Sequence, residues 1–515
     1  MLLLPSLLLL AQSPLTHSAP WLGQPLDVEL NGLLPGVAVG LYYSPSAASF
    51  PTPFGLLELD PAGLLQIGSG LADAQGEVAF QFALPQVAAL AEAPAHLQAL
   101  VVDGTAGTVS LSHAAHLRLL GSRFYSSESR FDAGLQGFVS RLAVRSSPSM
   151  DLVFELPPTA TEFGARTYLS ADGSVAAVVT NNAVRRFDNF FGSASDELLL
   201  GDVRGAAVDA SGDALLVYVG PDFFSPGEVQ RVPLEVGAPA VPLGIFGNVG
   251  PATFDPAANR AYLPALPTAA FEARVREVDL ATSATIAEHV VAPPNHAELD
   301  WVRTLNGSLV AGSHTDDEFL TANASLGRVD LASPGAPALQ NLGSNDQTAV
   351  AGPLAATGEL LLIARDWPFA GPVAPDLTLG LFDASTPSSL TAVPQPFAAP
   401  DNYTIVVDLG ASVWLVDRCC DQIFGGDNLR LFQLDPLTGA LADVSPGPQG
   451  YLDQQYSAAG GTSDFGGQTL VLGPNCPLMS CPGIAFRVRD AATGAETLVP
   501  TGGWFVEWLE GLSIP

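Results

Sequence analysis

Residues 314–318 place an imidazole and three carboxylates in one short acidic stretch, His-Thr-Asp-Asp-Glu. Carboxylate oxygens suit Ca²⁺, and an imidazole beside a carboxylate can transfer protons as a general acid or base. We therefore take His314, Asp316 and Asp317 as candidates for ligand or cation binding. A solvated acidic loop without any site is the alternative interpretation.

Two further stretches pair a carboxylate with an aromatic ring: Asp366-Trp367 and residues 222–224, Asp-Phe-Phe. Such pairs are typical of carbohydrate and peptide sites, because the ring offers an apolar face while the carboxylate binds a polar group. A ring that covers the apolar end of a sheet is the alternative. We keep Asp366 and Trp367 as ligand-binding candidates.

The cysteines are confined to the last quarter of the chain, as Cys419, Cys420, Cys476 and Cys481. Their spacing does not resemble a paired CxxC zinc site, and export would place them in an oxidising compartment, so we expect disulfides. Three connectivities are open: the adjacent pair together with a bond between the other two cysteines, or either of two crossed arrangements.

The adjacent cysteines follow Asp417 and Arg418, which makes residues 417–421 an unusual run. A disulfide between neighbouring cysteines would form a strained ring that could face a ligand, whereas stapling of the loop is the alternative. We add Asp417 and Arg418 to the ligand-binding candidates.

These candidates lie between short apolar runs that repeat along the chain. The repeat is marked by an Asp followed by small residues, often ending in Thr-Gly, as in residues 435–439. The Asp recurs at intervals of 51, 53, 52 and 55 residues, at Asp279, Asp330, Asp383, Asp435 and Asp490. Repeats of this length with strand patterns indicate the blades of a β-propeller.

Counting the blades leaves one strand over at the end of the chain. Seven tight turns each open into an apolar run, for example residues 175–179, and an eighth run at 123–125 precedes them. Residues 503–509 form a late strand with no strands after it. We predict that it completes the blade at residues 123–156, giving eight blades and no exposed edge. A seven-bladed ring with residues 123–156 as a linker is the alternative.

The connections within a blade alternate between the two ends of the propeller. Those from the second to the third strand share one end with the blade-to-blade links, and they are long here, as at residues 313–325, 365–375 and 417–428. Long loops on a rigid scaffold commonly carry binding sites. We call this the long-loop end and predict that it holds the functional surface.

The first 119 residues have a different pattern. Residues 1–11 are apolar apart from Ser6, and we predict a signal peptide at residues 1–19, although no basic residue precedes Arg118. Residues 20–119 alternate short β runs with Pro and Gly breaks, which predicts a small β-sandwich. The propeller takes residues 120–515. The expected fold is therefore all-β, in a secreted, periplasmic or cell-surface protein.

The Asp-x-x-Thr-Gly phrase resembles the YVTN-type surface-protein repeats and also those of quinoprotein dehydrogenases, which are eight-bladed and can carry an adjacent Cys-Cys disulfide. Quinoprotein repeats normally have a Trp a few residues past the Gly, but none follows Gly439 or Gly494. That departure argues against a quinone cofactor. Residues 54–61 and 72–80 resemble an N-terminal module of predicted secreted bacterial proteins, which implies secretion and a sandwich but no activity.

Charge restricts the partners. The chain has 52 acidic and 20 basic residues, for a formal net charge of -32, and every basic residue is Arg. A field of this sign repels phosphate backbones and anionic lipids, so we expect no nucleic acid partner and no membrane insertion. We expect a monomer that binds a protein, peptide or glycan without catalysis, with calcium as the one cofactor kept open. A propeller enzyme at the channel mouth, either a metal-assisted hydrolase (lactonase) or a quinoprotein dehydrogenase, is the alternative.

Overall fold

The computed structural model describes most of the chain. The described residues are 15–157, 166–222, 224–267, 269, 271–315, 324–333, 337–343, 347–365, 379–383, 390–394, 403–418, 429–445, 456–463, 468–474 and 485–512. Within them the regular structure is β-strand, apart from the short 3₁₀ turns η1 (Pro61–Gly63) and η2 (Ala88–Leu90). The predicted all-β fold is confirmed.

The N-terminal part is a small β-sandwich. One sheet has the strand order β1-β2-β7, the other has the order β10-β8-β3-β6 with β9 paired to β8, and β4 and β5 form a hairpin. The strands are β1 (Leu15–His17), β2 (Pro25–Leu30), β3 (Ala38–Ser44), β4 (Ala47–Thr52), β5 (Gly55–Leu59), β6 (Leu65–Leu71), β7 (Val78–Ala83), β8 (Pro94–Asp103), β9 (Thr108–Leu111) and β10 (Ala115–Arg118).

Alternation along the strands builds the sandwich core. In β2 every second residue is buried, which turns Leu26, Val28 and Leu30 inward. They pack with Leu41 and Ala99 of the other sheet in one apolar cluster. A period of two is what a sheet with one solvated face requires, so the sequence pattern fixes which face is inside.

The predicted signal peptide overlaps the start of this sandwich. Residues 1–14 lie outside the described residues, but β1 falls within the predicted leader and pairs with β2, with Leu15 opposite Leu30. Cleavage after residue 19 would remove this edge strand and leave β2 as the new edge. The leader stays a prediction.

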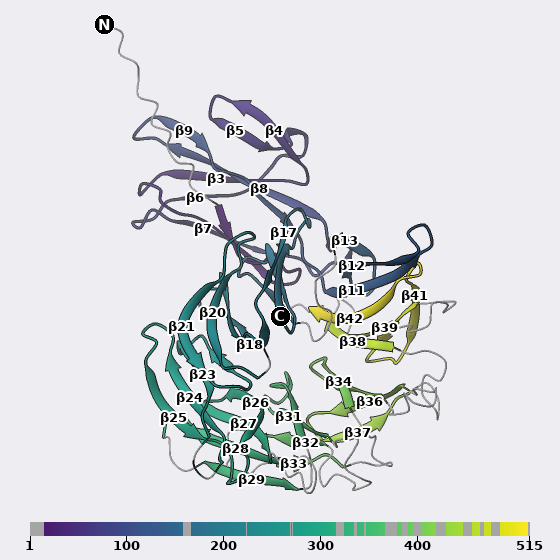
Figure 1. Cartoon of the computed structure of the whole chain (residues 1–515). Helices are drawn as coiled ribbons and strands as arrows, with labels where there is room; N and C mark the ends of the chain where they lie inside the picture. Colours follow the sequence, from purple (N-terminus) through teal and green to yellow (C-terminus); the bar gives the residue numbers. More distant parts are fainter. Residues whose placement is uncertain are drawn as a thin grey trace.

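The rest of the described chain forms eight four-stranded antiparallel sheets arranged in a ring (Figure 1). Seven of them run in chain order: β14 (Arg166–Leu169), β15 (Val175–Val179), β16 (Ala183–Asp188), β17 (Ser195–Leu199); β18 (Asp202–Val208), β19 (Ala214–Gly220), β20 (Gly227–Pro233), β21 (Val241–Gly247); β22 (Thr253–Asp255), β23 (Arg260–Ala265), β24 (Arg274–Asp279), β25 (Thr285–Val290); β26 (Glu298–Leu305), β27 (Ser308–His314), β28 (Ala324–Asp330), β29 (Ala338–Gly343); β30 (Gln347–Ala351), β31 (Leu360–Arg365), β32 (Leu379–Phe382), β33 (Leu390–Ala392); β34 (Tyr403–Asp408), β35 (Val413–Arg418), β36 (Leu429–Asp435), β37 (Ala440–Asp443); β38 (Tyr456–Ser463), β39 (Gln468–Pro474), β40 (Ala485–Asp490) and β41 (Glu496–Pro500).

The remaining sheet joins the two ends of the propeller. It has the order β13-β12-β11-β42, built from β11 (Arg123–Asp132), β12 (Gly137–Ser146), β13 (Leu152–Leu156) and the last strand β42 (Phe505–Leu512). Arg123 lies opposite Leu512 in the register of β11 and β42. The C-terminal strand is therefore the innermost strand of the first blade, as predicted, and residues 123–156 are not a linker.

The repeated Asp phrase closes the third strand of a blade. At the end of β36, the carboxylate of Asp435 accepts hydrogen bonds from the backbone N–H of Leu437 at 2.9 Å and from the hydroxyl of Thr438 at 2.7 Å. Gly439 completes the turn at φ 69°, in the left-handed region that glycine adopts without strain. The phrase is structural, and it faces away from the long-loop end.

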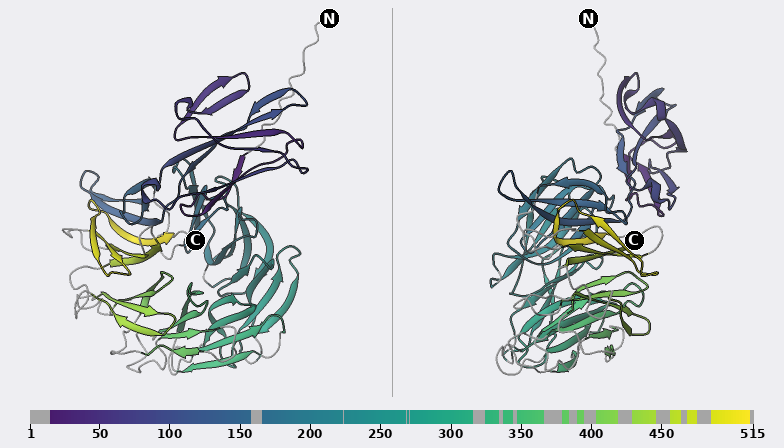
Figure 2. Two further views of the ribbon diagram at one scale, coloured as in Figure 1. Left: turned by 180° about the vertical axis from the view of Figure 1, so that it is seen from behind. Right: turned by 90° about the vertical axis from the view of Figure 1, so that its right-hand side faces the viewer.

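The sandwich is fixed to the first two blades. The guanidinium of Arg123 in β11 donates to Glu92 of the sandwich at 2.9 Å and to the side chain of Asn189 in the second blade at 2.9 Å. Phe190, next to Asn189, packs into the sandwich core. Figures 1 and 2 show the sandwich at the rim of the ring, away from the blades built by β30 to β37.

Candidate functional site

The innermost strand of each blade begins at the long-loop end, where the second strand of the same blade finishes. In the blade of β26 to β29 this brings Glu298, at the start of β26, opposite His314, at the end of β27. The predicted site residue His314 therefore lies at the predicted end, beside the channel. Its neighbours in the acidic stretch, Asp316 and Asp317, fall outside the described residues.

The other predicted site residues are outside the described side chains. Asp366, Trp367 and the four cysteines lie in undescribed segments, and Asp417 and Arg418 end β35 with only their backbone described. Their roles in ligand binding, and the disulfide pairing of Cys419, Cys420, Cys476 and Cys481, stay predictions.

Both ring nitrogens of His314 are occupied. Nδ1 lies 2.7 Å from Oδ1 of Asp300, and Nε2 lies 3.2 Å from Oε2 of Glu298. Burial opposes the charged ring, but these hydrogen bonds and negative charges outweigh it and raise the pKa of His314 to about 10. The imidazole is therefore a cation at neutral pH, held as a bridge between two carboxylates, and offers no lone pair to a metal or to a proton donor.

Asp300 links this bridge to the next blade. Its Oδ2 accepts hydrogen bonds from the backbone N–H of Thr348 at 2.8 Å and from the hydroxyl of the same residue at 2.9 Å. That hydroxyl also accepts the indole N–H of Trp301 at 3.0 Å. Gly312, opposite Trp301, makes room for this contact, since a Cβ at position 312 would lie 2.4 Å from the indole nitrogen. This chain of contacts stabilises the wall of the channel.

The predicted carboxylate and aromatic pair at residues 222–224 is partly described. The carboxylate of Asp222 accepts from the backbone N–H of Phe224 and from the hydroxyl of Ser225, both at 2.9 Å, and so stabilises its own turn. The ring of Phe224 is 84% exposed, so it does not cover the end of a blade.

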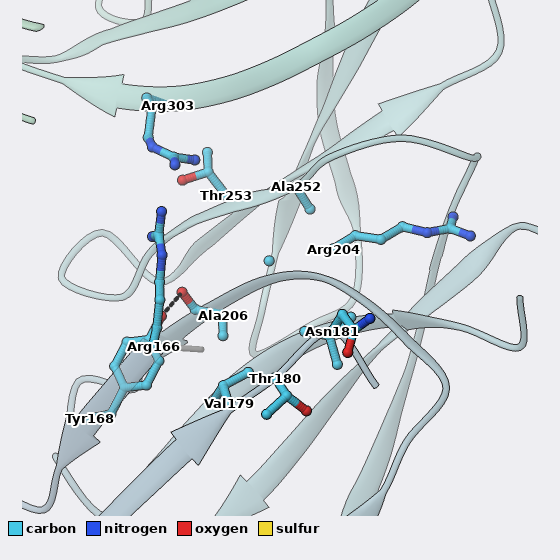
Figure 3. A pocket seen from close by; sticks show the side chains of 12 residues that line it. Arg166, Tyr168, Val179, Thr180, Asn181, Arg204, Ala206, Ala252, Thr253 and Arg303 are labelled. Carbon is cyan, nitrogen blue, oxygen red and sulfur yellow. Dashed lines mark hydrogen bonds between the residues drawn. The ribbon is translucent and has the colours of Figure 1, made fainter. Parts of the chain in front are cut away.

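A cavity of about 380 Å³ lies among the innermost strands of four blades (Figure 3). Most of its lining residues come from the starts of innermost strands β14, β18 and β22 and from the end of β15, so it lies toward the long-loop end, and Arg303 reaches it from the later half of β26. Lining side chains include Arg166, Tyr168, Thr180, Thr253 and Arg303. This volume is within the range of about 300–1,000 Å³ typical of small-molecule sites.

Two arginines from opposite walls meet in the cavity. Arg166 opens β14, Arg303 lies in β26, and Figure 3 shows their guanidinium groups pointing toward each other, with the hydroxyl of Thr253 beside Arg303. Burial and the charge of Arg166 lower the pKa of Arg303 to about 10, so it is still a cation at neutral pH. The cavity therefore presents two like charges to its interior.

The floor of the cavity is shaped by close contact between blades. A Cβ at Gly205 in β18 would lie 2.4 Å from the carbonyl oxygen of Ala252, so only glycine lets these innermost strands approach. Tyr168 donates its hydroxyl to the carbonyl of Ala206 at 3.1 Å. Arg204 lines the wall with its stem, but Figure 3 shows its guanidinium turned away from Arg166, and its Nε donates to Asp202 at 2.7 Å.

Sequence reasoning missed this cavity because its residues come from four blades. One signal was available: a charged residue on an innermost strand must face the channel or be paired, and both Arg166 and Arg303 fall on such strands. The order of the strands within a blade is enough to predict that each arginine faces the channel. That the two side chains converge cannot be predicted in this way, because it depends on how the ring of blades curves.

Within the described part of the chain, no three or more His, Cys, Asp or Glu side chains come close enough together to hold a metal ion. Nor does the same part contain a helix of the length and apolarity needed to cross a membrane.

No family model matches the chain, and no curated protein matches its sequence. Among solved structures, apo AztD from Citrobacter koseri has a TM-score of 0.48 and 11% identity over 76% of this chain and 98% of that one. The β-propeller domain of the trilobed protease from Pyrococcus furiosus has a TM-score of 0.35 and 10% identity over 65% and 96%. TolB from Acinetobacter baumannii has a TM-score of 0.30 and 10% identity over 76% and 83%. At these values the resemblances carry no argument about ligands or activity.

Proposed function

We propose that this protein is a noncatalytic binding protein that receives its ligand in the channel at the long-loop end of the propeller. The observation that carries the proposal is the cavity of about 380 Å³, which is walled by the starts of innermost strands and lined with polar side chains. Concave sites with a few converging polar groups are the usual ligand sites of rigid scaffolds.

The neighbouring titratable groups support binding over catalysis. His314 is the one described imidazole of the predicted acidic stretch, and its bonds to Glu298 and Asp300 leave it charged and without a free nitrogen. A general base needs an unprotonated atom within reach of the substrate. The described groups here act to hold the wall, which is what a binding site requires.

The ligand we propose is a protein, a peptide, a glycan or a small molecule. The protein would bind it as a monomer, outside the cytoplasm. Calcium at residues 314–318 stays open, since the carboxylates of Asp316 and Asp317 are outside the described residues. The apolar start of the chain supports export. Expression in a bacterial host followed by the intact mass of the exported protein tests it: we expect loss of about the first 19 residues, and a cytoplasmic, full-length product would contradict export.

The binding proposal is tested by filling the cavity. Thr253→Trp places an indole on the cavity wall, whereas Thr253→Ser keeps the hydroxyl and leaves the cavity open. Ligands found by ligand-observed NMR from a mixture of saccharides, peptides and small acids should bind the native protein and the Ser variant, but not the Trp variant. Equal binding to the Trp variant would place the site elsewhere, provided that circular dichroism shows the same fold.

A further inference from the structure

The arginines of this chain are scarce, and most described ones are ion-paired. There are 52 acidic residues for 20 arginines. In the described part, arginines on blade surfaces contact carboxylates, as Arg231 does with Asp209 at 2.8 Å and Arg260 with Asp279 at 2.8 Å. Neither Arg166 nor Arg303 lies within 4.0 Å of a carboxylate of the described residues. Arg130, Arg185 and Arg489 also have no ion pair among the described residues, but Arg130 and Arg489 lie over Trp rings and Arg185 donates to the carbonyl of Pro157. Arg166 and Arg303 differ from them in facing each other across a cavity.

The backbone positions that carry the two guanidinium groups are fixed by strand pairing. Arg166 is the first residue of β14, paired with Val179. Arg303 lies in the second half of β26, where it pairs with Val310, and its Nη1 donates to the carbonyl of Val302 at 2.9 Å. No other hydrogen bond joins its guanidinium group to a described residue. Groups carried on paired strands keep their geometry better than groups on loops.

Two facing cations in a partly buried cavity repel each other, and a carboxylate side chain between them would remove that cost. The chain has carboxylates in abundance but places no described one there. An oxyanion from solution would do the same, accepting N–H groups from both guanidinium forks and the hydroxyl of Thr253.

The negative charge of the whole molecule does not prevent this. At physiological ionic strength the Debye length is about 8 Å, so the distant carboxylates are largely screened while direct contacts to Arg166 and Arg303 are not. The same field still repels polyanions, whose charges extend beyond the cavity. A small ligand with one compact anionic group fits both conditions.

We propose that the channel cavity binds a small oxyanion, a carboxylate, sulfate or phosphate, between Arg166 and Arg303, with Thr253 as a further hydrogen-bond donor. This inference rests on the proposed function, since it names the chemistry of the group that the cavity receives. The anionic group can be a free small acid or the acidic end of a larger ligand.

Calorimetry on the full chain tests the inference. The probes are citrate, glucuronate, sulfate and phosphate at fixed ionic strength, with glucose as the neutral partner of glucuronate. The variants are Arg166→Gln and Arg303→Gln, and the matched control is Arg231→Gln, which removes the same charge from a side chain 42% exposed on the third strand of a blade. Arg303→Lys keeps the charge and loses the planar fork.

We expect at least one anion to bind the native protein and the Arg231→Gln control alike, about tenfold or more weaker with either cavity Gln variant, as loss of a charge-assisted hydrogen bond predicts. Arg303→Lys should lie between the native protein and Arg303→Gln. Comparison of the four anions identifies whether the group is a carboxylate, sulfate or phosphate.

Three outcomes would overturn the inference: no anion binds, anions bind the cavity variants as well as the control, or glucose binds as tightly as glucuronate. The proposed function, that the cavity binds a ligand, is tested separately by the Thr253→Trp variant. If neutral ligands bind and Thr253→Trp removes them while the anions do not bind, the proposed function stands and the oxyanion inference fails. If the Trp variant changes nothing, the proposed function fails.

Discussion

Two groups of arginines in this propeller have opposite surroundings. In the first blade, Arg141 and Arg145 both bind the fully buried carboxylate of Glu128, at 2.8 and 2.6 Å. In the channel, Arg166 and Arg303 face each other (Figure 3), and among the described residues no ion pair joins either of them to a carboxylate. The first group satisfies its charges within the fold, and for the second we propose an oxyanion that comes from solution.

The paired group belongs to the closure of the ring. Trp504, just before β42, lies under the guanidinium groups of Arg130 and Arg141, with 3.8 Å from the Arg141 carbon to the ring centroid. Ser126 of β11 donates its hydroxyl to Glu128 at 2.9 Å. The network therefore joins β11 and β12 to the end of the chain, and its charges are structural.

The largest effect should come from Glu128→Gln. Loss of this charge leaves the buried Arg145 without its anion, and breaking a buried pair costs about 3–5 kcal/mol of stability. Urea unfolding at pH 7 measures the loss. Glu496→Gln is the control, because its pair with Arg487 is partly exposed and should cost about 0–1 kcal/mol. Equal losses of unfolding free energy in the two variants would show that the Glu128 network stabilises the closed ring no more than an ordinary surface ion pair does.

The pH dependence of stability, compared between the native protein and Glu128→Gln, tests whether the charged carboxylate of Glu128 provides this stabilisation. Burial acts to raise the pKa of Glu128, but the hydrogen bonds and charges of Arg145 and Arg141 outweigh it and lower the pKa below 4.5. A lowered pKa gives stability that is present above 4.5 and is lost as the pH falls through the folded value. The native protein should lose this contribution in acid, and Glu128→Gln should not.

The blades follow from local patterns, whereas the site does not. The second strand β19 is buried at all seven positions, so its continuous apolar run can be recognised without knowing any neighbour. The turn of Asp435 is equally local. Arg166 and Arg303 belong to strands far apart in the sequence, and their meeting depends on how four blades curve around a channel, which no local pattern contains. His314 was singled out, but its partners Glu298 and Asp300 come from the preceding strand.

His314→Gln should have the intermediate effect, because the charged ring is paired at the edge of the same channel. Its raised pKa means that the stabilisation is fully present below 6.5 and is lost as the pH rises through about 10. We expect a loss of about 1.5–3 kcal/mol at pH 6 that shrinks toward pH 10. The control is His113→Gln, whose side chain is 69% exposed. The imidazole NMR signal of His314 is the one that is absent from His314→Gln. If this signal titrates near pH 6.5, the bridge between the two carboxylates is contradicted.

The smallest effect on stability should come from Arg303→Gln. If the channel arginines serve a ligand and not the fold, removal of one relieves a like-charge contact and changes the free energy of unfolding by no more than about 0.5 kcal/mol, in either direction. The measurement is urea unfolding without added anion, beside Arg145→Gln, for which loss from the buried network predicts about 3–5 kcal/mol. A loss above about 2 kcal/mol for Arg303→Gln would make this arginine a structural residue like Arg145, and the two groups would no longer differ in kind.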